Sequence, residues 1–198
     1  MLPVVIEKHL LNSFFIKVKL PISENIKKDV LDKICVEKNE SLFCVDDYYT
    51  DNISYLDWGQ RRNWNRPWVN SIKPYLDIEL KNIFNALGYH DVYIEDLWFQ
   101  RYLKDSSHGW HVHGSTFTAV YYLELPENAP KTELIEPFDQ KKIFIPNITE
   151  NDLLIFPSYV IHRAPVITNE NVSKTIISFN LSVNNPLKEI TSKALLNC

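Results

Sequence analysis

The sequence predicts a mostly β protein, a β-barrel or jelly roll with flanking helices packed on one side. Two stretches of helical periodicity lie in the first half of the chain, at about residues 23–37 and 71–87. Beyond Gly88 the pattern changes to short strand-like segments separated by clusters of Pro, Asn, Glu and Asp. Helices followed by closely spaced short strands favour this architecture.

The N-terminal half begins with a strand expected at about residues 14–20. The first helix, at 23–37, follows Pro21 and has apolar residues at intervals of three to four positions. The second helix, at 71–87, has the same periodicity and stops at Gly88, a residue that commonly ends helices. Both helices are expected to lie against the outside of a sheet.

The second half contains the strands of the predicted barrel. They are expected at residues 92–103, 116–125, 142–145, 152–156 and 174–183. In the last strand, an apolar face alternates with a more polar one that begins at Lys174 and includes Ser178 and Asn180. A lysine that opens this face could meet an anion inside the barrel.

Length and composition fit one domain with a substantial core. The chain has 198 residues, 45% of them hydrophobic, which is enough for one core and short for two. We expect a single domain over residues 1–198, with a helical and strand buttress and a lid region at 1–90 and the β core at 91–185. The net charge of −4 argues against a nucleic-acid partner, because phosphate binding needs clustered Lys and Arg.

The cysteines and the N-terminus suggest the compartment. Cys35, Cys44 and Cys198 lack the paired spacing of a zinc ribbon or a disulfide framework, so we expect reduced thiols and a cytoplasmic protein. Residues 1–17 include charged side chains and no small-residue cleavage site, so we expect neither a signal peptide nor a membrane span there.

The segment at residues 51–70 interleaves aromatic residues with cations. Its members are Trp58, Arg61, Arg62, Trp64, Arg66 and Trp68. One interpretation is a lid or a stacking platform for a ligand. The other, which we favour, is a long loop that its tryptophans fix to the sheet, with the arginines solvated or paired.

Three histidines form the candidate chemical site. His111 and His113 flank Val112, and residues two apart in a strand point the same way. His162 follows the buried strand that ends at Pro157, so a later strand can bring it to the same place. Imidazole suits iron, copper, nickel or zinc, and three ligands on one side of an ion leave positions open for a reaction. The pattern therefore predicts a catalytic metal site.

Four segments carry a resemblance to a known superfamily. They are Trp110-His111-Val112-His113-Gly114, Val120-Tyr121-Tyr122-Leu123, Phe156-Pro157-Ser158-Tyr159-Val160-Ile161-His162 and Lys174-Thr175-Ile176-Ile177-Ser178-Phe179-Asn180. In order and spacing, residues 98–183 resemble the double-stranded β-helix oxygenases that use iron(II) and 2-oxoglutarate, prolyl hydroxylases included. They are most similar to an uncharacterised branch with a Trp-His-x-His and a Phe-Pro-Ser-x-x-x-His pattern. The resemblance implies a cupin-like jelly roll.

The same resemblance implies an activity. The implied enzyme is a dioxygenase that uses dioxygen as the oxidant and couples decarboxylation of 2-oxoglutarate to oxidation of its substrate. The oxidation is as a rule a hydroxylation, and the substrate is an amino-acid side chain or a small metabolite. The resemblance implies that His111, His113 and His162 bind iron(II). It also implies that the cofactor-binding residues are Lys174, Tyr122, Tyr102 and Asn180. For the tyrosines and Asn180, structural roles in the core or in capping a backbone group are the alternative.

Two positions depart from the pattern of that superfamily. His113 stands where the usual ligand set has a carboxylate, which leaves Asp105 open as a competing ligand. His108 is three residues from His111, so we expect it on the opposite strand face, as a supporting or surface residue. Lys174 stands where the family has arginine. Since lysine offers a mobile point charge in place of a two-pronged fork, a weaker or different co-substrate remains open.

Two other function classes remain. A metal-dependent cupin that does not use 2-oxoglutarate fits an all-histidine site, although the glutamate expected soon after the second histidine is missing and Glu124 lies too far along. The second class is a non-enzymatic module that binds carbohydrate or nucleic acid through residues 58–68. Release of succinate separates the oxygenase from both, and metal content separates the cupin from the binding module.

Overall fold

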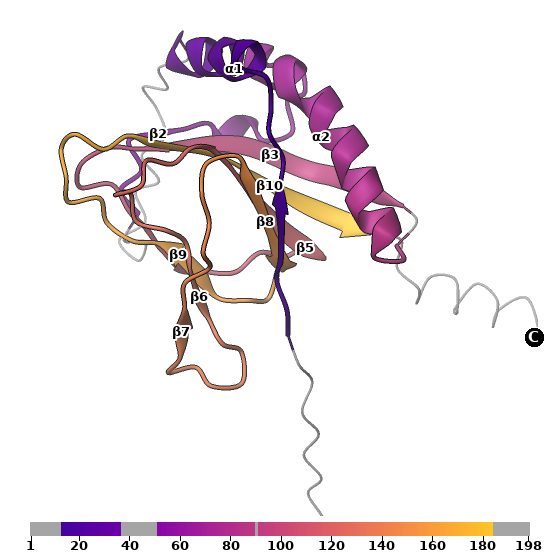
Figure 1. Cartoon of the computed structure of the whole chain (residues 1–198), viewed down its shortest axis with the longest axis vertical. Helices are drawn as coiled ribbons and strands as arrows, with labels where there is room; N and C mark the ends of the chain where they lie inside the picture. Colours follow the sequence, from indigo (N-terminus) through magenta and orange to yellow (C-terminus); the bar gives the residue numbers. More distant parts are fainter. Residues whose placement is uncertain (1–12, 37–50, 90, 184–198) are drawn as a thin grey trace, which may run out of the picture.

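The computed structural model describes residues 13–36, 51–89 and 91–183, and Figure 1 shows how its elements are arranged. In chain order they are β1 (Ile16–Lys19), α1 (Glu24–Val36), β2 (Tyr55–Leu56), a short 3-10 helix η1 (Trp58–Gln60), α2 (Pro67–Ala86), β3 (Val92–Tyr102), β4 (His108–His111), β5 (Phe117–Glu124), β6 (Glu133–Ile135), β7 (Ile143–Phe144), β8 (Asp152–Pro157), β9 (His162–Ala164) and β10 (Lys174–Val183). The expectation of neither a signal peptide nor a membrane span concerns in part residues 1–12, and the expectation of reduced thiols concerns the three cysteine side chains. Both lie outside the described parts of the chain.

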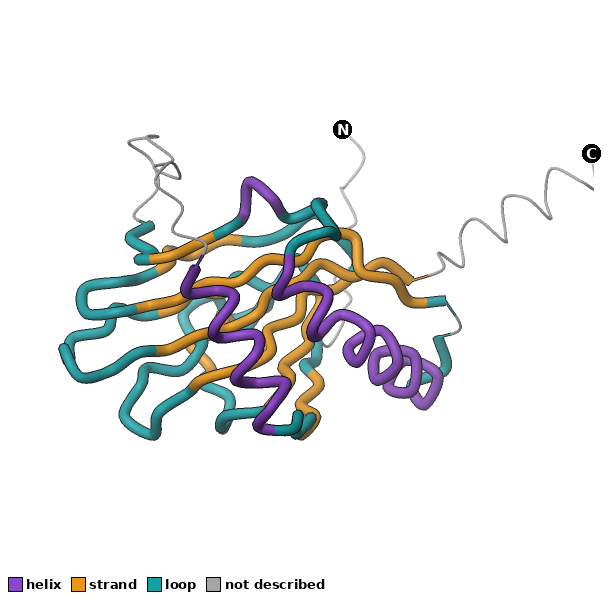
Figure 2. Tube along the Cα trace, turned by 90° about the horizontal axis from the view of Figure 1, so that it is seen from above, coloured by secondary structure: helices purple, strands orange, loops and turns teal. Residues whose placement is uncertain are grey.

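The strands form two antiparallel sheets. The large sheet has six strands in the order β1-β8-β5-β10-β3-β2, and the small one has four in the order β4-β9-β6-β7. Both helices cross the same outer face of the large sheet, and the small sheet lies on its other side (Figures 1 and 2). The predicted fold class, mostly β with helices on one side, is confirmed. Among the described residues, no helix is long and apolar enough to cross a membrane.

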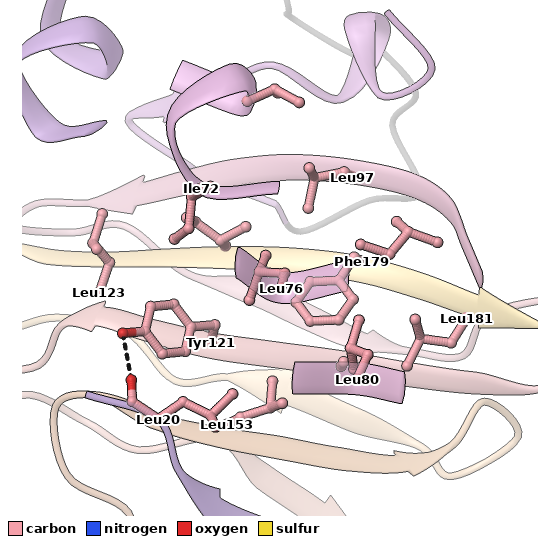
Figure 3. Packing of buried hydrophobic residues seen from close by; sticks show 14 of the residues in the cluster. Leu20, Ile72, Leu76, Leu80, Leu97, Tyr121, Leu123, Leu153, Phe179 and Leu181 are labelled. Carbon is pink, nitrogen blue, oxygen red and sulfur yellow. Dashed lines mark hydrogen bonds between the residues drawn. The ribbon is translucent and has the colours of Figure 1, made fainter. Parts of the chain in front are cut away.

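The large sheet has two different faces because side chains alternate along each strand. The outer face packs against α2, where Leu97, Phe99, Ile177, Phe179 and Leu181 meet the helix in one buried cluster (Figure 3). The inner face points toward the small sheet. It carries Trp98, Gln100 and Tyr102 from β3, Thr118, Val120 and Tyr122 from β5, and Lys174, Ile176, Ser178 and Asn180 from β10. The last strand therefore alternates as predicted, and its polar residues Lys174, Ser178 and Asn180 lie in the interior between the two sheets.

Helix α2 begins at Pro67, four residues before the predicted start. Proline suits the first turn of a helix because its missing N–H would have no partner there, and Trp68 and Val69 extend the buried stripe. The C-terminal end is as predicted. Gly88 has φ of +85°, the left-handed region that glycine adopts at little cost, and its N–H donates to Asn85 O.

Four short strands were not predicted from the sequence. They are β2, β4, β6 and β9, each of two to four residues, which is too short for an alternation pattern to stand out. Two strands from the N-terminal half join the large sheet, since β1 pairs with β8 and β2 pairs with β3. The N-terminal region thus supplies edge strands as well as the helices.

Residues 51–66 are fixed to β3 by a buried ion pair. Asp57, fully buried, pairs with Arg66, and it accepts hydrogen bonds from Trp68 Nε1 at 2.9 Å and from the Phe99 N–H at 2.8 Å. Arg66 also donates to Leu97 O at 2.6 Å. This arrangement matches the favoured interpretation in part, because Arg66 is paired and the loop is attached to the sheet, whereas Trp68 lies in helix α2 and not in the loop.

We expect Asp57→Ala to destabilise the fold by about 3–5 kcal/mol, because removing one partner leaves the Arg66 charge buried and uncompensated. Urea unfolding followed by tryptophan fluorescence measures this change. Lys28→Ala is the control, since it removes an ion pair with Asp32 on an exposed helix surface and should leave the unfolding midpoint nearly unchanged. Equal midpoints for Asp57→Ala and the parent protein would contradict the structural role of this pair.

Candidate metal centre

Three histidines converge between the two sheets. The ring nitrogens of His111, His113 and His162 that could hold an ion all lie within 4.8 Å of one another. His111 ends β4 and His162 opens β9, and the two are cross-strand partners. His113 lies just beyond β4, where its N–H donates to Ser158 O at 3.0 Å. The structure therefore brings together the three residues that the sequence pattern selected.

Backbone carbonyls orient two of the rings. His111 Nδ1 lies 2.7 Å from Gly109 O, and His162 Nδ1 lies 3.0 Å from Val160 O. A carbonyl can only accept, so each Nδ1 carries the proton and each Nε2 keeps its lone pair. This is the usual way in which a protein prepares a histidine to bind a metal through Nε2.

Burial keeps the cluster neutral. Desolvation lowers the pKa of His113 to about 4, and it also lowers the pKa values of His111 and His162, the latter strongly because His111 adds to the effect. Neutral imidazole is the form that binds metal. At pH 7 all three rings therefore have a lone pair to donate.

His108 lies on the same side as His111, contrary to expectation. The two rings stack with centroids 3.7 Å apart, because the pairing of β4 with β9 shifts register between them and a simple strand alternation does not apply. Gln100 Nε2 lies 3.2 Å from His108 Nδ1, and Asp51 Oδ2 lies 3.3 Å from its Nε2. With both nitrogens engaged, His108 supports the His111 ring.

The competing carboxylate ligand, Asp105, is exposed in a turn with φ of 66° and is not part of the histidine cluster. A carboxylate that contacts a neighbour of the cluster is Asp51, which sequence analysis did not select. It accepts from the Gly109 N–H at 2.8 Å as well as contacting His108. Nothing in its sequence neighbourhood marks it, since the contact joins residues 58 positions apart.

A narrow cavity adjoins the histidines. Its free volume of about 20 Å³ is room for little more than one water molecule. It is lined by Trp98, Gln100, Tyr102, His108, His111, His113, Thr118, Val120, Thr132, His162, Arg163, Ala164, Ile176 and Ser178. Both sheets thus contribute to it, with the inner face of the large sheet as its floor.

Arg163, which lines the cavity, stacks on Trp110 with its guanidinium 4.4 Å from the ring centroid, and its Nε donates to Glu133 at 2.8 Å. Trp110 is 38% exposed. A cation and an aromatic ring are therefore stacked next to the cavity wall.

Lys174 is buried behind the cavity. It lies beside Tyr102 across the β3–β10 pairing, 1% exposed, and its Nζ donates to Pro130 O at 3.0 Å. No carboxylate of the described residues pairs with it. Desolvation lowers the pKa of Lys174 to about 8. The Tyr102 hydroxyl is buried without a hydrogen-bond partner in the same described set.

Of the four residues selected as cofactor-binding, Tyr102 lines the cavity, and Lys174, Tyr122 and Asn180 do not. The Tyr122 hydroxyl lies 2.6 Å from Thr132 Oγ1, and the ring centroid of Tyr122 is 6.0 Å from Lys174 Nζ. Asn180 Nδ2 donates to Asp96 Oδ2 at 3.0 Å. Thr132 and Gln100 line the cavity and were missed. Gln100 could have been found, because it alternates with Trp98 and Tyr102 along a predicted strand.

Comparisons with known proteins give a result at the level of fold. No family model matches the chain, and no curated protein matches its sequence. The solved structure of a collagen prolyl hydroxylase from Paramecium Bursaria Chlorella virus-1, a 2-oxoglutarate complex, superposes with a TM-score of 0.58 at 14% identity, covering 84% of this chain and 94% of that chain.

Two further structures are similar. A prolyl hydroxylase from Trichoplax adhaerens, bound to a peptide fragment of the hypoxia inducible factor oxygen degradation domain, has a TM-score of 0.58 at 14% identity, covering 90% of this chain and 86% of that chain. An oxidoreductase of the 2OG-Fe(II) oxygenase family from Burkholderia pseudomallei has a TM-score of 0.52 at 15% identity, covering 60% and 57%. The chain therefore has the jelly-roll fold of these oxygenases, which confirms the predicted double-stranded β-helix.

Proposed function

We propose that this chain is an iron(II)- and 2-oxoglutarate-dependent oxygenase that hydroxylates an amino-acid side chain or a small metabolite. In this proposal His111, His113 and His162 hold the iron, and Lys174 with Tyr102 binds the far carboxylate of 2-oxoglutarate. Because many chemistries share one fold, the proposal must rest on the site rather than on the fold alone. The observation that carries it is a buried lysine without a carboxylate partner among the described residues, beside Tyr102 in the wall of the cavity that the three histidines line.

The three histidines fit iron(II). Imidazole suits iron, and a set of three ligands leaves coordination positions for a co-substrate and dioxygen. Two of the rings already present Nε2 through hydrogen bonds from Nδ1 to carbonyls. When bound, the metal supplies activation of dioxygen, and the protein holds an open face of ligands in a water-poor cavity.

Lys174 fits an anionic co-substrate. A buried ammonium without a carboxylate partner is costly, and its lowered pKa records that cost. An arriving carboxylate would remove the penalty, and the unpartnered Tyr102 hydroxyl could donate a second hydrogen bond to it. Among the described residues, this pair supplies the binding groups for the far end of a dicarboxylate.

The cavity must widen to admit 2-oxoglutarate, because about 20 Å³ of free volume is far below the size of the molecule. Lys174 must also exchange its bond to Pro130 O for one to the ligand. The Pro130 carbonyl and Thr132 belong to the connection between β5 and β6, so movement of this connection is the change that we expect on binding. Loop rearrangements of this kind accompany binding in a substantial minority of complexes.

The activity is tested by incubating the protein with iron(II), 2-oxoglutarate and dioxygen and measuring succinate. We expect slow iron-dependent release of succinate even without the primary substrate, and no release from His162→Ala. Metal binding without consumption of 2-oxoglutarate would instead support the metal-dependent cupin. Absence of metal binding would support a non-enzymatic binding module.

Binding of 2-oxoglutarate should be accompanied by proton uptake near pH 8. Since the pKa of Lys174 is lowered to about 8, about half of the free protein carries a neutral lysine at that pH. A bound carboxylate raises the pKa again, so each binding event protonates part of the population. Above this pKa, affinity should fall by about tenfold for each pH unit, whereas well below it the uptake should vanish.

Calorimetry of 2-oxoglutarate binding to the manganese-loaded protein, in two buffers of different ionisation enthalpy, measures this uptake. Lys174→Arg is the control, because a guanidinium stays protonated over this range. Identical heats in both buffers at pH 8 would contradict protonation of Lys174 by the ligand.

A further inference from the structure

His113 differs from the other two proposed ligands in what holds its ring. His111 and His162 each donate a ring N–H to a backbone carbonyl. For His113 no backbone carbonyl among the described residues plays this part. Its ring lies over the indole of Trp98, with centroids 5.8 Å apart and planes 25° from parallel. The ring therefore rests on the inner face of β3, and its orientation depends on the side chains of that face.

Toward the N-terminal end of β3, the inner face beside Trp98 carries a carboxylate, Asp96, and an amide, Asn180. Asp96 precedes Trp98 by two residues in β3, and its cross-strand partner in β10 is Asn180. Asn180 Nδ2 donates to Asp96 Oδ2 at 3.0 Å. Asn180 Oδ1 is buried and makes no hydrogen bond within the described residues. A buried acceptor without a donor is rare in a folded protein and indicates a missing partner.

The chemistry of the pair fixes which way the amide points. An ionised carboxylate only accepts, so Asn180 must present Nδ2 to Asp96, and Oδ1 must face away from it. Asp96 is itself held by Arg62, whose Nε donates to Oδ1 at 2.7 Å, with Arg61 Nε 3.4 Å away. The Asn180 side chain lies within reach of the His113 ring, and the Asp96 charge acts on the same ring from farther away.

We propose that Asn180, oriented by Asp96, is a positioning residue for His113. Its Oδ1 accepts the N–H of the ring nitrogen that does not face the other two histidines, which leaves the second nitrogen free to bind the metal. The inference rests on the proposed metal site and goes beyond it. Three histidine ligands lack the negative charge that a carboxylate ligand would supply. In this proposal Asp96 supplies that charge indirectly, because it holds the Asn180 amide and the amide holds the His113 ring.

This assignment also decides between two roles for Asn180. A residue that contacts the co-substrate would direct a side-chain group at Lys174 or into the cavity, whereas the neighbours found for the Asn180 side chain are Asp96 and the His113 ring. A residue that caps the backbone would bond to a main-chain group, and the partner found is the Asp96 carboxylate. The orphaned oxygen beside the His113 ring fits ring positioning.

The test uses cobalt(II) as the probe, because it binds imidazole and needs no turnover. We expect Asn180→Leu, which removes the acceptor and keeps the volume, to weaken cobalt affinity in calorimetry by about 10- to 100-fold. Asp96→Asn keeps the shape of the side chain but removes its charge, and it allows the Asn180 amide to turn over. Cobalt affinity should therefore fall in this variant as well. Ser182→Ala is the matched control, because it removes one hydrogen bond from the same strand, to Glu95 at 2.5 Å.

A second readout separates positioning from general support of the fold. The ¹⁵N chemical shifts of the His113 ring report which nitrogen carries the proton in the metal-free protein. We expect one tautomer in the parent chain and in Ser182→Ala, and a mixture in Asn180→Leu and Asp96→Asn. If Asn180→Leu does not fold, Asp96→Asn alone decides the question.

The outcomes separate the two claims. Cobalt binding and His113 tautomer that are unchanged in the folded variants would overturn the positioning role, while leaving the metal site intact. Cobalt binding in the parent chain that survives His111→Ala and His162→Ala would overturn the metal site itself. A loss of 2-oxoglutarate affinity at saturating cobalt, with the tautomer unchanged, would assign Asn180 to the co-substrate and also overturn the positioning role.

Discussion

Replacing His162 with alanine is expected to weaken metal binding more than any other single change in the protein. Loss of a residue that only orients a ligand costs about 10- to 100-fold in metal affinity. Loss of one of three ligands must cost more, so we expect a decrease of over about 100-fold. His162 is the most buried of the three, at 5% exposure, and its Nδ1 is fixed by Val160 O. Calorimetry with cobalt(II) or, without oxygen, iron(II) measures the effect.

The matched control is His108→Ala. This ring stacks on His111 but has both nitrogens engaged by Gln100 and Asp51, so its loss should reduce affinity by a smaller factor. Metal affinity that falls more in His108→Ala than in His162→Ala would show that the ligand set is wrong. The same result in Asp51→Ala would place a carboxylate in the site.

Lys174→Ala should weaken 2-oxoglutarate binding without affecting the metal. Removing one partner of a buried, hydrogen-bonded charge pair costs about 2–5 kcal/mol, much of it because the other charge stays uncompensated. Each 1.4 kcal/mol is about a factor of ten, so we expect a loss of at least about tenfold in affinity. Calorimetry of 2-oxoglutarate binding to the manganese-loaded variant measures it.

Lys174→Arg examines the geometry of the same contact. If the pocket has room for the guanidinium fork, affinity should hold or improve, and a pocket built around lysine should reject it. Tyr102→Phe removes the second donor and should have a smaller effect of the same sign. Unchanged 2-oxoglutarate affinity in Lys174→Ala would mean that another cation, such as Arg163 in the cavity wall, holds the carboxylate.

The parts of the fold that sequence predicted are those with strong local periodicity. Strand β10 alternates over its whole length, so both its buried outer residues and the interior position of Lys174 followed from the pattern. Helix α2 was found from its apolar stripe, with its end at Gly88. The start was missed because Pro67 was not taken as a first-turn residue and because Trp68 was assigned to the loop.

The parts that sequence could not supply depend on contacts between distant residues. Asp51 meets His108 across a loop, and Asp57 meets Arg66 and the β3 backbone. The side of the strand on which His108 lies depends on a register shift in β4 that no local pattern reveals. Asn180 was selected, but its link to Asp96 required the pairing of β10 with β3.

A crystal structure of the protein with manganese(II) and 2-oxoglutarate, grown without oxygen, would show directly which residues bind the metal and the co-substrate. We expect one metal ion bonded to a nitrogen of each of His111, His113 and His162, with the far carboxylate of 2-oxoglutarate within hydrogen-bonding distance of Lys174 Nζ. A metal bound by His108 and Asp51, or a carboxylate held by Arg163 with Lys174 still on Pro130 O, would contradict this expectation.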